Sequence, residues 1–311
     1  MNKKDVALAF FIATIWGGNF TVIKIGLHDM PPMLLAALRY TFTALPIIFF
    51  IRKPAIEGRY VLAYGLTIGF GQFACLFYAM TIGMPAGIAS MILQSQAFFT
   101  IIFAFLLLKE PIKARQILGF FVAFLGLYCI GGINDVNLVF SIPGFALFLT
   151  IAAAAFWGIS NVIVRLAARK AASRGEKLDT LSLVAWSSLV PPLPLLAMAL
   201  LMDTPETLWS SLTNIKGSAI FSIAYLAYGG TILGSTCWSR LLTKHPAGSI
   251  APFSLLVPIS GLLIAQVVLG ERLSASQWLG SAIILLGLII CNTNFSSLRI
   301  MLSSSGRNRS S

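Results

Sequence analysis

Charged residues are scarce in this sequence, and acidic residues are the scarcest. Asp, Glu, Lys and Arg make up 10% of the 311 residues, while apolar residues make up 58%. Soluble domains carry about 25% charged residues, so the composition excludes an ordinary soluble fold. All ten acidic residues lie between long apolar stretches or at their ends: Asp5, Asp29, Glu57, Glu110, Asp135, Glu176, Asp179, Asp203, Glu206 and Glu271. Because proton- and sodium-driven carriers and exporters of cationic compounds commonly use a carboxylate inside the membrane, both classes are disfavoured.

Histidine and cysteine are too few and too scattered to suggest a metal centre. The two histidines, His28 and His245, lie in separate loops. The four cysteines each lie inside an apolar stretch, without paired or metal-like spacing: Cys75, Cys129, Cys237 and Cys291. We interpret them as small buried apolar side chains. We also find no nucleophile elbow, phosphate loop or catalytic carboxylate pair. The sequence therefore predicts neither an enzyme nor a bound metal or cofactor.

Long apolar runs, in contrast, are abundant. A helix needs about 20 mainly apolar residues to cross the hydrocarbon core of a bilayer. Ten stretches meet this need: 6–27, 33–51, 61–80, 86–107, 115–132, 143–164, 180–202, 217–239, 247–269 and 277–294. The first follows Lys3 and Lys4 as a signal peptide would, but no small-residue cleavage site is evident after it, so we expect it to be retained. We predict an all-α polytopic membrane protein with ten transmembrane helices.

One pattern occurs twice, 161 positions apart. Pro85-Ala86-Gly87 returns as Pro246-Ala247-Gly248, and Glu110, Gln116, Gly119 and Gly126 return as Glu271, Gln277, Gly280 and Gly287. Each half also opens with a Trp-Gly step and a cation eight positions after the tryptophan, Trp16 with Lys24 and Trp157 with Arg165. Such repeats define the architecture of a chain. We predict two five-helix repeats, 5–133 and 143–294, and a disordered cytoplasmic tail at 295–311, with extra length in loops at 169–179 and 203–216.

The repeat and the basic residues together predict an orientation. Five crossings per half make the second half enter from the opposite side, so the repeats are expected to be inverted. The net charge of +12 does not indicate nucleic-acid binding, because with a cytoplasmic N-terminus the outer loops hold only Lys216 and Arg272. This asymmetry predicts that both termini are cytoplasmic. Inverted repeats are typical of transporters that bind substrate near the membrane midplane, although channels and scramblases can share the symmetry.

Two basic residues fall inside predicted spans. Arg39 lies about two turns inside the second span, and Lys24 lies near the outer end of the first. A charged side chain inside the bilayer is costly and indicates a functional site, but either residue could instead extend to the outer interface. A pocket that contained these charges would be neutral to positive. It would suit a solute that carries a carboxylate, including a zwitterion.

Other polar and aromatic side chains at membrane depth complete the predicted substrate site. These residues, together with Lys24 and Arg39, are Trp16, Asn19, Gln72, Tyr78, Gln94, Gln96, Trp157, Asn161, Tyr225, Tyr228, Trp238 and Ser254. For Gln94 and Gln96 the alternative role is hydrogen bonding between helices. Ser254 lies between Pro252 and Pro258, which would break the ninth span and free carbonyls for a polar ligand. The prolines at 191–194 predict a kink in the seventh span.

The doubled pattern resembles a known family. Two five-helix halves, each with Trp-Gly near its start and Lys-Glu or Gly-Glu after its fourth span, are similar to the EamA branch of the drug/metabolite transporter superfamily. The resemblance covers about residues 5–294. It implies a transporter of small molecules in the inner membrane with a cavity between the repeats. The first half has Lys109-Glu110 where the second has Gly270-Glu271.

Within that family, four segments resemble exporters of O-acetylserine and cysteine. They are residues 24–32, 83–87, 94–100 and 252–258. The resemblance implies efflux of small neutral amino acids through a cavity walled by spans one, three, four, six, eight and nine. Other members export aromatic amino acids, threonine or other metabolites, so these substrates remain alternatives, and a non-transporting membrane protein is a further one. The expected partners are a small amino-acid substrate and the lipid bilayer, and the expected state is a monomer or a weak homodimer.

Overall fold

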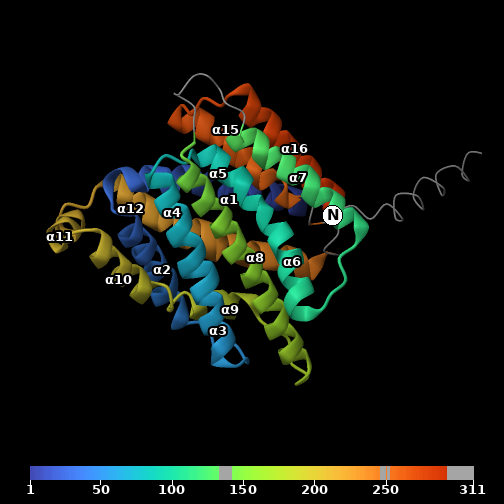
Figure 1. Ribbon diagram of the computed structural model, residues 1–311. Helices are drawn as coiled ribbons and strands as arrows, with labels where there is room; N and C mark the ends of the chain where they lie inside the picture. Colours follow the sequence, from blue (N-terminus) through green and yellow to red (C-terminus); the bar gives the residue numbers. More distant parts are fainter. Residues whose placement is uncertain (133–141, 246–249, 251–252, 293–311) are drawn as a thin grey trace, which may run out of the picture.

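The computed structural model describes residues 1–132, 142–245, 250 and 253–292, and these residues form helices with no strand (Figure 1). Six helical segments are long and apolar enough to cross a membrane: Lys3–Asp29, Gly58–Thr81, Ala86–Leu108, Gly144–Ala172, Thr180–Met202 and Gly217–Leu241. Four shorter apolar helices accompany them: α2 (Pro32–Ile48), α7 (Ala114–Gly132), α15 (Leu256–Leu269) and α16 (Ala275–Asn292). The predicted helical membrane fold is confirmed, whereas the count of ten crossings stays a prediction.

Three of the long segments change helical type along their length. The third predicted span consists of α3 (Gly58–Tyr64), the π-helical η1 (Gly65–Gln72) and α4 (Phe73–Thr81). The eighth consists of α12 (Gly217–Ala224), the π-helical η4 (Tyr225–Leu233) and α13 (Gly234–Lys244). The fourth consists of α5 (Ala86–Ile92), a 3-10 turn η2 (Leu93–Ser95) and α6 (Gln96–Leu108). The two π-helical segments lie one repeat length apart, and such segments often accompany functional sites.

The seventh predicted span breaks at its prolines, as expected. It is divided into α9 (Thr180–Ser187) and α10 (Pro192–Met202). Proline has no amide hydrogen and clashes with the preceding turn of a helix, so the helix ends before Pro191 and restarts at Pro192. The side chain of Asp179 caps the N-terminus of α9 by accepting hydrogen bonds from the amides of Leu181 and Ser182.

The two long loops predicted in the second half contain more helix than expected. α8 (Gly144–Ala172) continues into the predicted loop at 169–179, because the alanine-rich residues 167–172 favour a helix without being a long apolar run. α11 (Pro205–Thr213) occupies most of the predicted loop at 203–216. Its N-terminus has a Thr204 side-chain cap and Pro205 at the first helical position. Neither segment is a long apolar run, so apolar stretches of membrane length do not reveal it.

The last helices of the two halves, α7 and α16, lie side by side (Figure 1). A Cβ on Gly119 would lie 2.6 Å from the carbonyl oxygen of Gly287, and a Cβ on Gly126 would lie 2.6 Å from that of Gly280. Glycine at these four positions therefore lets the two backbones approach. Since Gly119 and Gly126 are the repeat counterparts of Gly280 and Gly287, the same contact is made twice, as across a two-fold axis.

The Trp-Gly steps join the first span of each half to the fourth span of the other. A Cβ on Gly17, in α1 (Lys3–Asp29), would lie 2.6 Å from the backbone nitrogen of Gly261 in α15. A Cβ on Gly158, in α8, would lie 2.9 Å from the backbone nitrogen of Thr100 in α6. Each half thus packs its first and fourth spans against the other half, so the two halves do not form separate domains.

The buried core and the outer surface are both apolar, as expected for a protein surrounded by lipid. Most of the largest fully buried side chains come from α1, α2, α4 and α5, and they include Phe77 and Ile88. Large apolar side chains also point outward: Phe50, Leu201 and Val267 are 86%, 87% and 84% exposed. An extended apolar surface of this kind fits contact with lipid tails.

The second Pro-Ala-Gly copy at 246–248, Pro252 and the predicted tail at 295–311 lie outside the described residues.

Candidate functional site

A cavity of about 420 Å³ lies between helices of both halves, within the size range of small-molecule sites. Its lining includes all six expected walls, with residues from α1, α3, η1, α4, η2, α6, α8, η4, α13 and α15 and with Ser254. Two further walls were not expected from the resemblance. α2 contributes Arg39 and Tyr40, and α9 contributes Val184, Ser187 and Ser188. The set of walls implied by the resemblance was therefore incomplete.

Nine of the fourteen predicted site residues line this cavity, and five do not. The nine are Trp16, Asn19, Arg39, Gln72, Gln94, Gln96, Trp157, Trp238 and Ser254. Lys24, Tyr78, Asn161, Tyr225 and Tyr228 lie elsewhere. Several other lining residues were not predicted, including Tyr40, Phe73 and Thr231. Tyr40 and Phe73 each follow a predicted residue directly in sequence, and that adjacency was the signal that could have found them.

Arg39 is the central feature of the cavity. Its side chain is buried, at 5% exposure, so it does not extend to the interface. The guanidinium carbon lies 3.9 Å from the centre of the Phe73 ring and 5.1 Å from that of Tyr40, which are cation–π distances. Its Nη2 donates to the Thr231 hydroxyl at 3.2 Å. Nε and Nη1 have no hydrogen-bond partner among the described residues. Arg39 is also the one charged side chain among the described residues that line the cavity.

Thr231 can accept from Arg39 because its own hydrogen is committed elsewhere. The Thr231 hydroxyl donates to the carbonyl oxygen of Leu226, five residues earlier in the π-helical η4, at 2.9 Å. Its lone pairs then face the guanidinium. The π-helical segment therefore places a hydrogen-bond acceptor beside a buried cation, where no described carboxylate is available.

Trp16, Asn19 and Trp238 form one wall of the cavity around Gly230 and Gly234. Trp16 donates its indole N–H to the carbonyl oxygen of Gly230 at 2.8 Å, and its ring centre lies 5.1 Å from that of Trp238. A Cβ on Gly230 would lie 2.5 Å from Asn19 Oδ1, so the glycine leaves the space that the amide occupies. These contacts fix the aromatic side chains that the sequence predicted at this wall.

Gln96 and Asn161 connect α6 to α8 beside the cavity. Asn161 Nδ2 donates to Gln96 Oε1 at 2.7 Å and to the Thr100 hydroxyl at 3.0 Å. The Thr100 hydroxyl also lies 3.4 Å from the carbonyl oxygen of Gly158. Gln96 thus takes part in a helix-to-helix hydrogen bond, the alternative role that the sequence left open for it, and Asn161 is its partner.

The remaining predicted residues have other positions. Lys24 donates to the carbonyl oxygen of Met80 and lines a separate pocket with Asp29 and Ser218. Tyr225 donates its hydroxyl to the carbonyl oxygen of Ile15 at 2.9 Å and so joins η4 to α1. Tyr228 is 43% exposed, and Tyr78 is half-buried outside the cavity lining.

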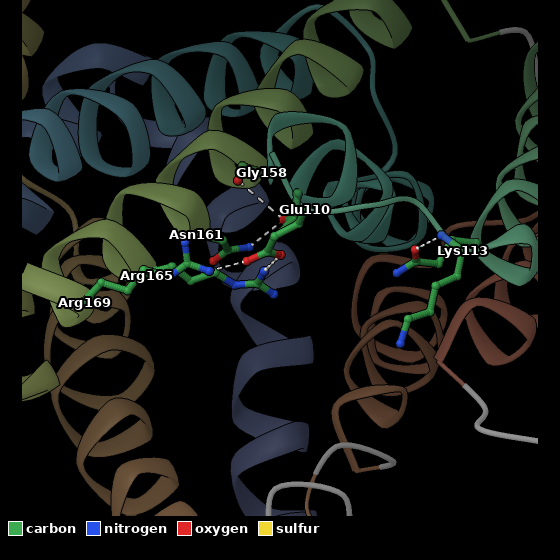
Figure 2. Close-up of polar contacts among 8 residues, drawn as sticks. Glu110, Lys113, Gly158, Asn161, Arg165 and Arg169 are labelled. Carbon is green, nitrogen blue, oxygen red and sulfur yellow. Dashed lines mark hydrogen bonds and ion pairs between the residues drawn. The ribbon is translucent and has the colours of Figure 1, made fainter. Parts of the chain in front are cut away.

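The two repeated glutamates lie at different contacts, although they occupy equivalent positions. Figure 2 shows Glu110 between Arg165 and Arg169 of α8, whose guanidinium nitrogens lie 3.0 and 2.6 Å from its carboxylate oxygens. Glu271 instead accepts from the backbone amides of Ala86 and Gly87, at 2.6 and 2.9 Å, and so caps the N-terminus of α5. The carboxylates of Glu110 and Glu271 therefore bind groups of other helices, and neither lines the cavity.

Comparison with known proteins decides the family. The model of the EamA-like transporter family matches residues 3–132 and again residues 144–293. The chain belongs to the EamA-like transporter family. A "Probable amino-acid metabolite efflux pump" of Salmonella typhimurium is 42% identical over 292 residues, which cover 93% of this chain and 95% of that protein. The protein of the same description from Escherichia coli is 41% identical over 290 residues, with the same coverage.

More distant similarities also extend over almost the whole chain. An "Uncharacterized transporter" of Archaeoglobus fulgidus is 27% identical over 294 residues, covering 93% of this chain and 98% of that protein. A crystal structure with 17% identity matches with a TM-score of 0.60 over 94% of this chain and 97% of its own, and this likeness concerns the fold alone. As a member of the EamA-like family, the chain is a multi-pass inner-membrane transporter and not an enzyme.

Proposed function

We propose that this transporter exports small neutral amino acids, with O-acetylserine and cysteine as the first candidates. Export proceeds by alternating access through the cavity, between two inverted repeats of five helices with both termini in the cytoplasm. The domain boundaries of these repeats are 5–133 and 143–294. The names of the two relatives above 40% identity, which speak of amino-acid metabolite efflux, support the substrate class. The reciprocal glycine contact between α7 and α16 supports the inverted symmetry.

The observation that carries the proposal is the buried guanidinium of Arg39. A buried polar group without a partner costs about 1–3 kcal/mol, and more when it is charged. Arg39 lines the cavity, and its Nε and Nη1 are buried without a partner among the described residues, so a ligand that accepts hydrogen bonds and carries negative charge would be stabilised there. A carboxylate fits, because it accepts from a guanidinium through two parallel hydrogen bonds.

The export proposal is tested by measuring amino acids in the medium of bacteria that overproduce the protein. We expect O-acetylserine and cysteine to accumulate above the level of a vector control. Arg39→Gln should lower that export about tenfold or more, because it removes a charged hydrogen-bond partner of the substrate. Arg59→Gln is the matched control, since Arg59 is exposed and stacks on Tyr60, and it should export normally.

Two results would contradict different parts of the proposal. A medium identical to that of the vector strain, with the protein present in the inner membrane, would refute both first-candidate substrates. Full export by Arg39→Gln would refute the role of Arg39 while leaving export intact. Accumulation of threonine, homoserine or aromatic amino acids instead would favour the alternative substrates of the same cavity.

A further inference from the structure

The cavity contains unpaired acceptors as well as unpaired donors. Asn19 Oδ1 and Gln72 Oε1 are buried and have no hydrogen-bond partner among the described residues, like Nε and Nη1 of Arg39. Gln72 is 3% exposed, so water outside the protein does not solvate its amide. All three side chains line the same cavity. The carboxylate of a substrate can satisfy the donors, but it cannot satisfy the two amide oxygens, which require a donor.

The acceptors lie next to the residues that hold Arg39. Asn19 packs on Gly230, which precedes Thr231, the hydrogen-bond partner of Arg39. Gln72 precedes Phe73, on which the guanidinium stacks. Gln72 is therefore the sequence neighbour of one Arg39 contact, and Asn19 packs on the sequence neighbour of the other. The carboxylate and the ammonium of an α-amino acid are attached to one carbon atom, so a short separation between the two subsites suits them.

Resting on the proposed export function, we infer that Asn19 Oδ1 and Gln72 Oε1 form an ammonium subsite beside the carboxylate subsite of Arg39. An ammonium group carries three N–H donors, and amide oxygens are acceptors of matching chemistry. The paired subsites select a zwitterionic α-amino acid. A deaminated acid leaves both amide oxygens unpaired, and an N-acylated acid offers them one uncharged N–H donor in place of three charged ones. An amine without a carboxylate meets the positive charge of Arg39.

Neutral acceptors are the suitable choice next to Arg39. A carboxylate at position 72 would attract the guanidinium when no substrate is bound, because opposite charges that line one buried cavity attract each other more strongly than in water. That attraction would compete with the substrate carboxylate. Amide oxygens leave the guanidinium free, and they still bind a cation. The described residues that line the cavity include no acidic side chain, which fits this requirement.

The test compares four ligands on the purified transporter by isothermal titration: L-cysteine, 3-mercaptopropionic acid, N-acetylcysteine and cysteamine. We expect the wild-type protein to bind L-cysteine about tenfold or more tightly than each of the other three, since a lost hydrogen bond to a charged group weakens binding by that order. Gln72→Leu and Asn19→Leu should each weaken L-cysteine about tenfold and leave 3-mercaptopropionic acid unchanged. Gln266→Leu, in α15 away from the cavity, is the matched control and should behave as wild type.

The outcomes separate the two proposals. If the wild-type protein does not bind L-cysteine, cysteine fails as a substrate and the ammonium subsite fails with it. If it binds L-cysteine and 3-mercaptopropionic acid equally well, the ammonium subsite is refuted while export stands, and this result needs no variant. Equal weakening of both ligands in Gln72→Leu and Asn19→Leu would also refute it. Selective loss of L-cysteine, with 3-mercaptopropionic acid still bound, supports it and shows that the variants are folded.

Discussion

Arg39 combines a rigid position with unused hydrogen-bonding capacity. The ring of Phe73 at 3.9 Å and the hydroxyl of Thr231 at 3.2 Å hold one face and one nitrogen of the guanidinium, which leaves Nε and Nη1 for a ligand. Lysine could not replace it, because an ammonium has no planar surface to stack and no fork of parallel donors. The orientation of the guanidinium thus depends on residues of α4 and η4, far from Arg39 in sequence.

The contact with Thr231 can be tested separately from the charge. Thr231→Val removes the hydroxyl that accepts from Arg39 and keeps the shape of the side chain. Because one hydrogen bond contributes about 0.5–1.5 kcal/mol, we expect the KM for export to rise by about two- to tenfold, with normal amounts of protein in the membrane. Thr231→Ser retains the hydroxyl and should stay near wild type. An unchanged KM in Thr231→Val would show that the rings of Phe73 and Tyr40 position the guanidinium without the hydroxyl.

At the scale of single helices, α6 and α15 end in the same way. Lys109 and Gly270, at equivalent repeat positions, have left-handed backbones with φ of 56° and 65°. The amides of the following Glu110 and Glu271 reach back to the carbonyl oxygens of Ala104 and Ala265, at 3.3 and 3.5 Å. Both helices thus end at a left-handed residue, a backbone conformation that favours glycine. The difference between Lys-Glu and Gly-Glu in the sequence is therefore a difference in backbone strain at the same turn.

Relief of that strain should stabilise the first half. A left-handed conformation costs a non-glycine residue about 1–2 kcal/mol, so Lys109→Gly should raise the free energy of unfolding by about 1 kcal/mol and the unfolding temperature in detergent by about 2 °C. Lys109→Ala removes the same charge and keeps a Cβ at the strained position, so it should give no increase. Equal stabilisation by both variants would assign the effect to the charge instead of the backbone.

At the scale of the whole molecule, the features that could be predicted are those that sequence determines locally. A crossing helix needs length and apolarity, and the repeat needs only a matching pattern, so the positions of the apolar helices and the break in the seventh span followed from the residues. α11 and the end of α8 did not, because neither is apolar. The sequence also did not predict that Glu110 and Glu271 contact different helices, because the two glutamates occupy equivalent positions in the repeat.

The site could be predicted only in part, because the direction in which a side chain points depends on packing between distant segments. Gln72 lies in the cavity and Tyr78 does not, although both occur in the third span. The π-helical η1 and η4 alter the register that simple helical spacing assumes. Tyr225 was predicted at the cavity but binds the backbone of α1, whereas Thr231, six positions later, holds Arg39. Membrane depth therefore identified candidates, and tertiary packing selected among them.

The reciprocal crossing of α7 and α16 leads to a prediction that concerns both halves at once. A side chain at Gly126 would meet the backbone of Gly280, and one at Gly280 would meet the backbone of Gly126 at 2.6 Å. Overpacking of this kind costs about 1–3 kcal/mol, so Gly126→Val and Gly280→Val should each lower the unfolding temperature. Gly144→Val is the control, because nothing lies within 4 Å of a Cβ there.

The combination of the two substitutions decides whether the crossing is shared. A first valine separates the helices, so a second valine opposite it meets a contact that is already open. Substitutions that share a contact are not additive, and we expect the double variant Gly126→Val/Gly280→Val to lose less stability than the two single losses together. Additive losses would mean that each glycine packs independently. The measurement therefore tests a symmetric contact that neither half of the sequence could form alone.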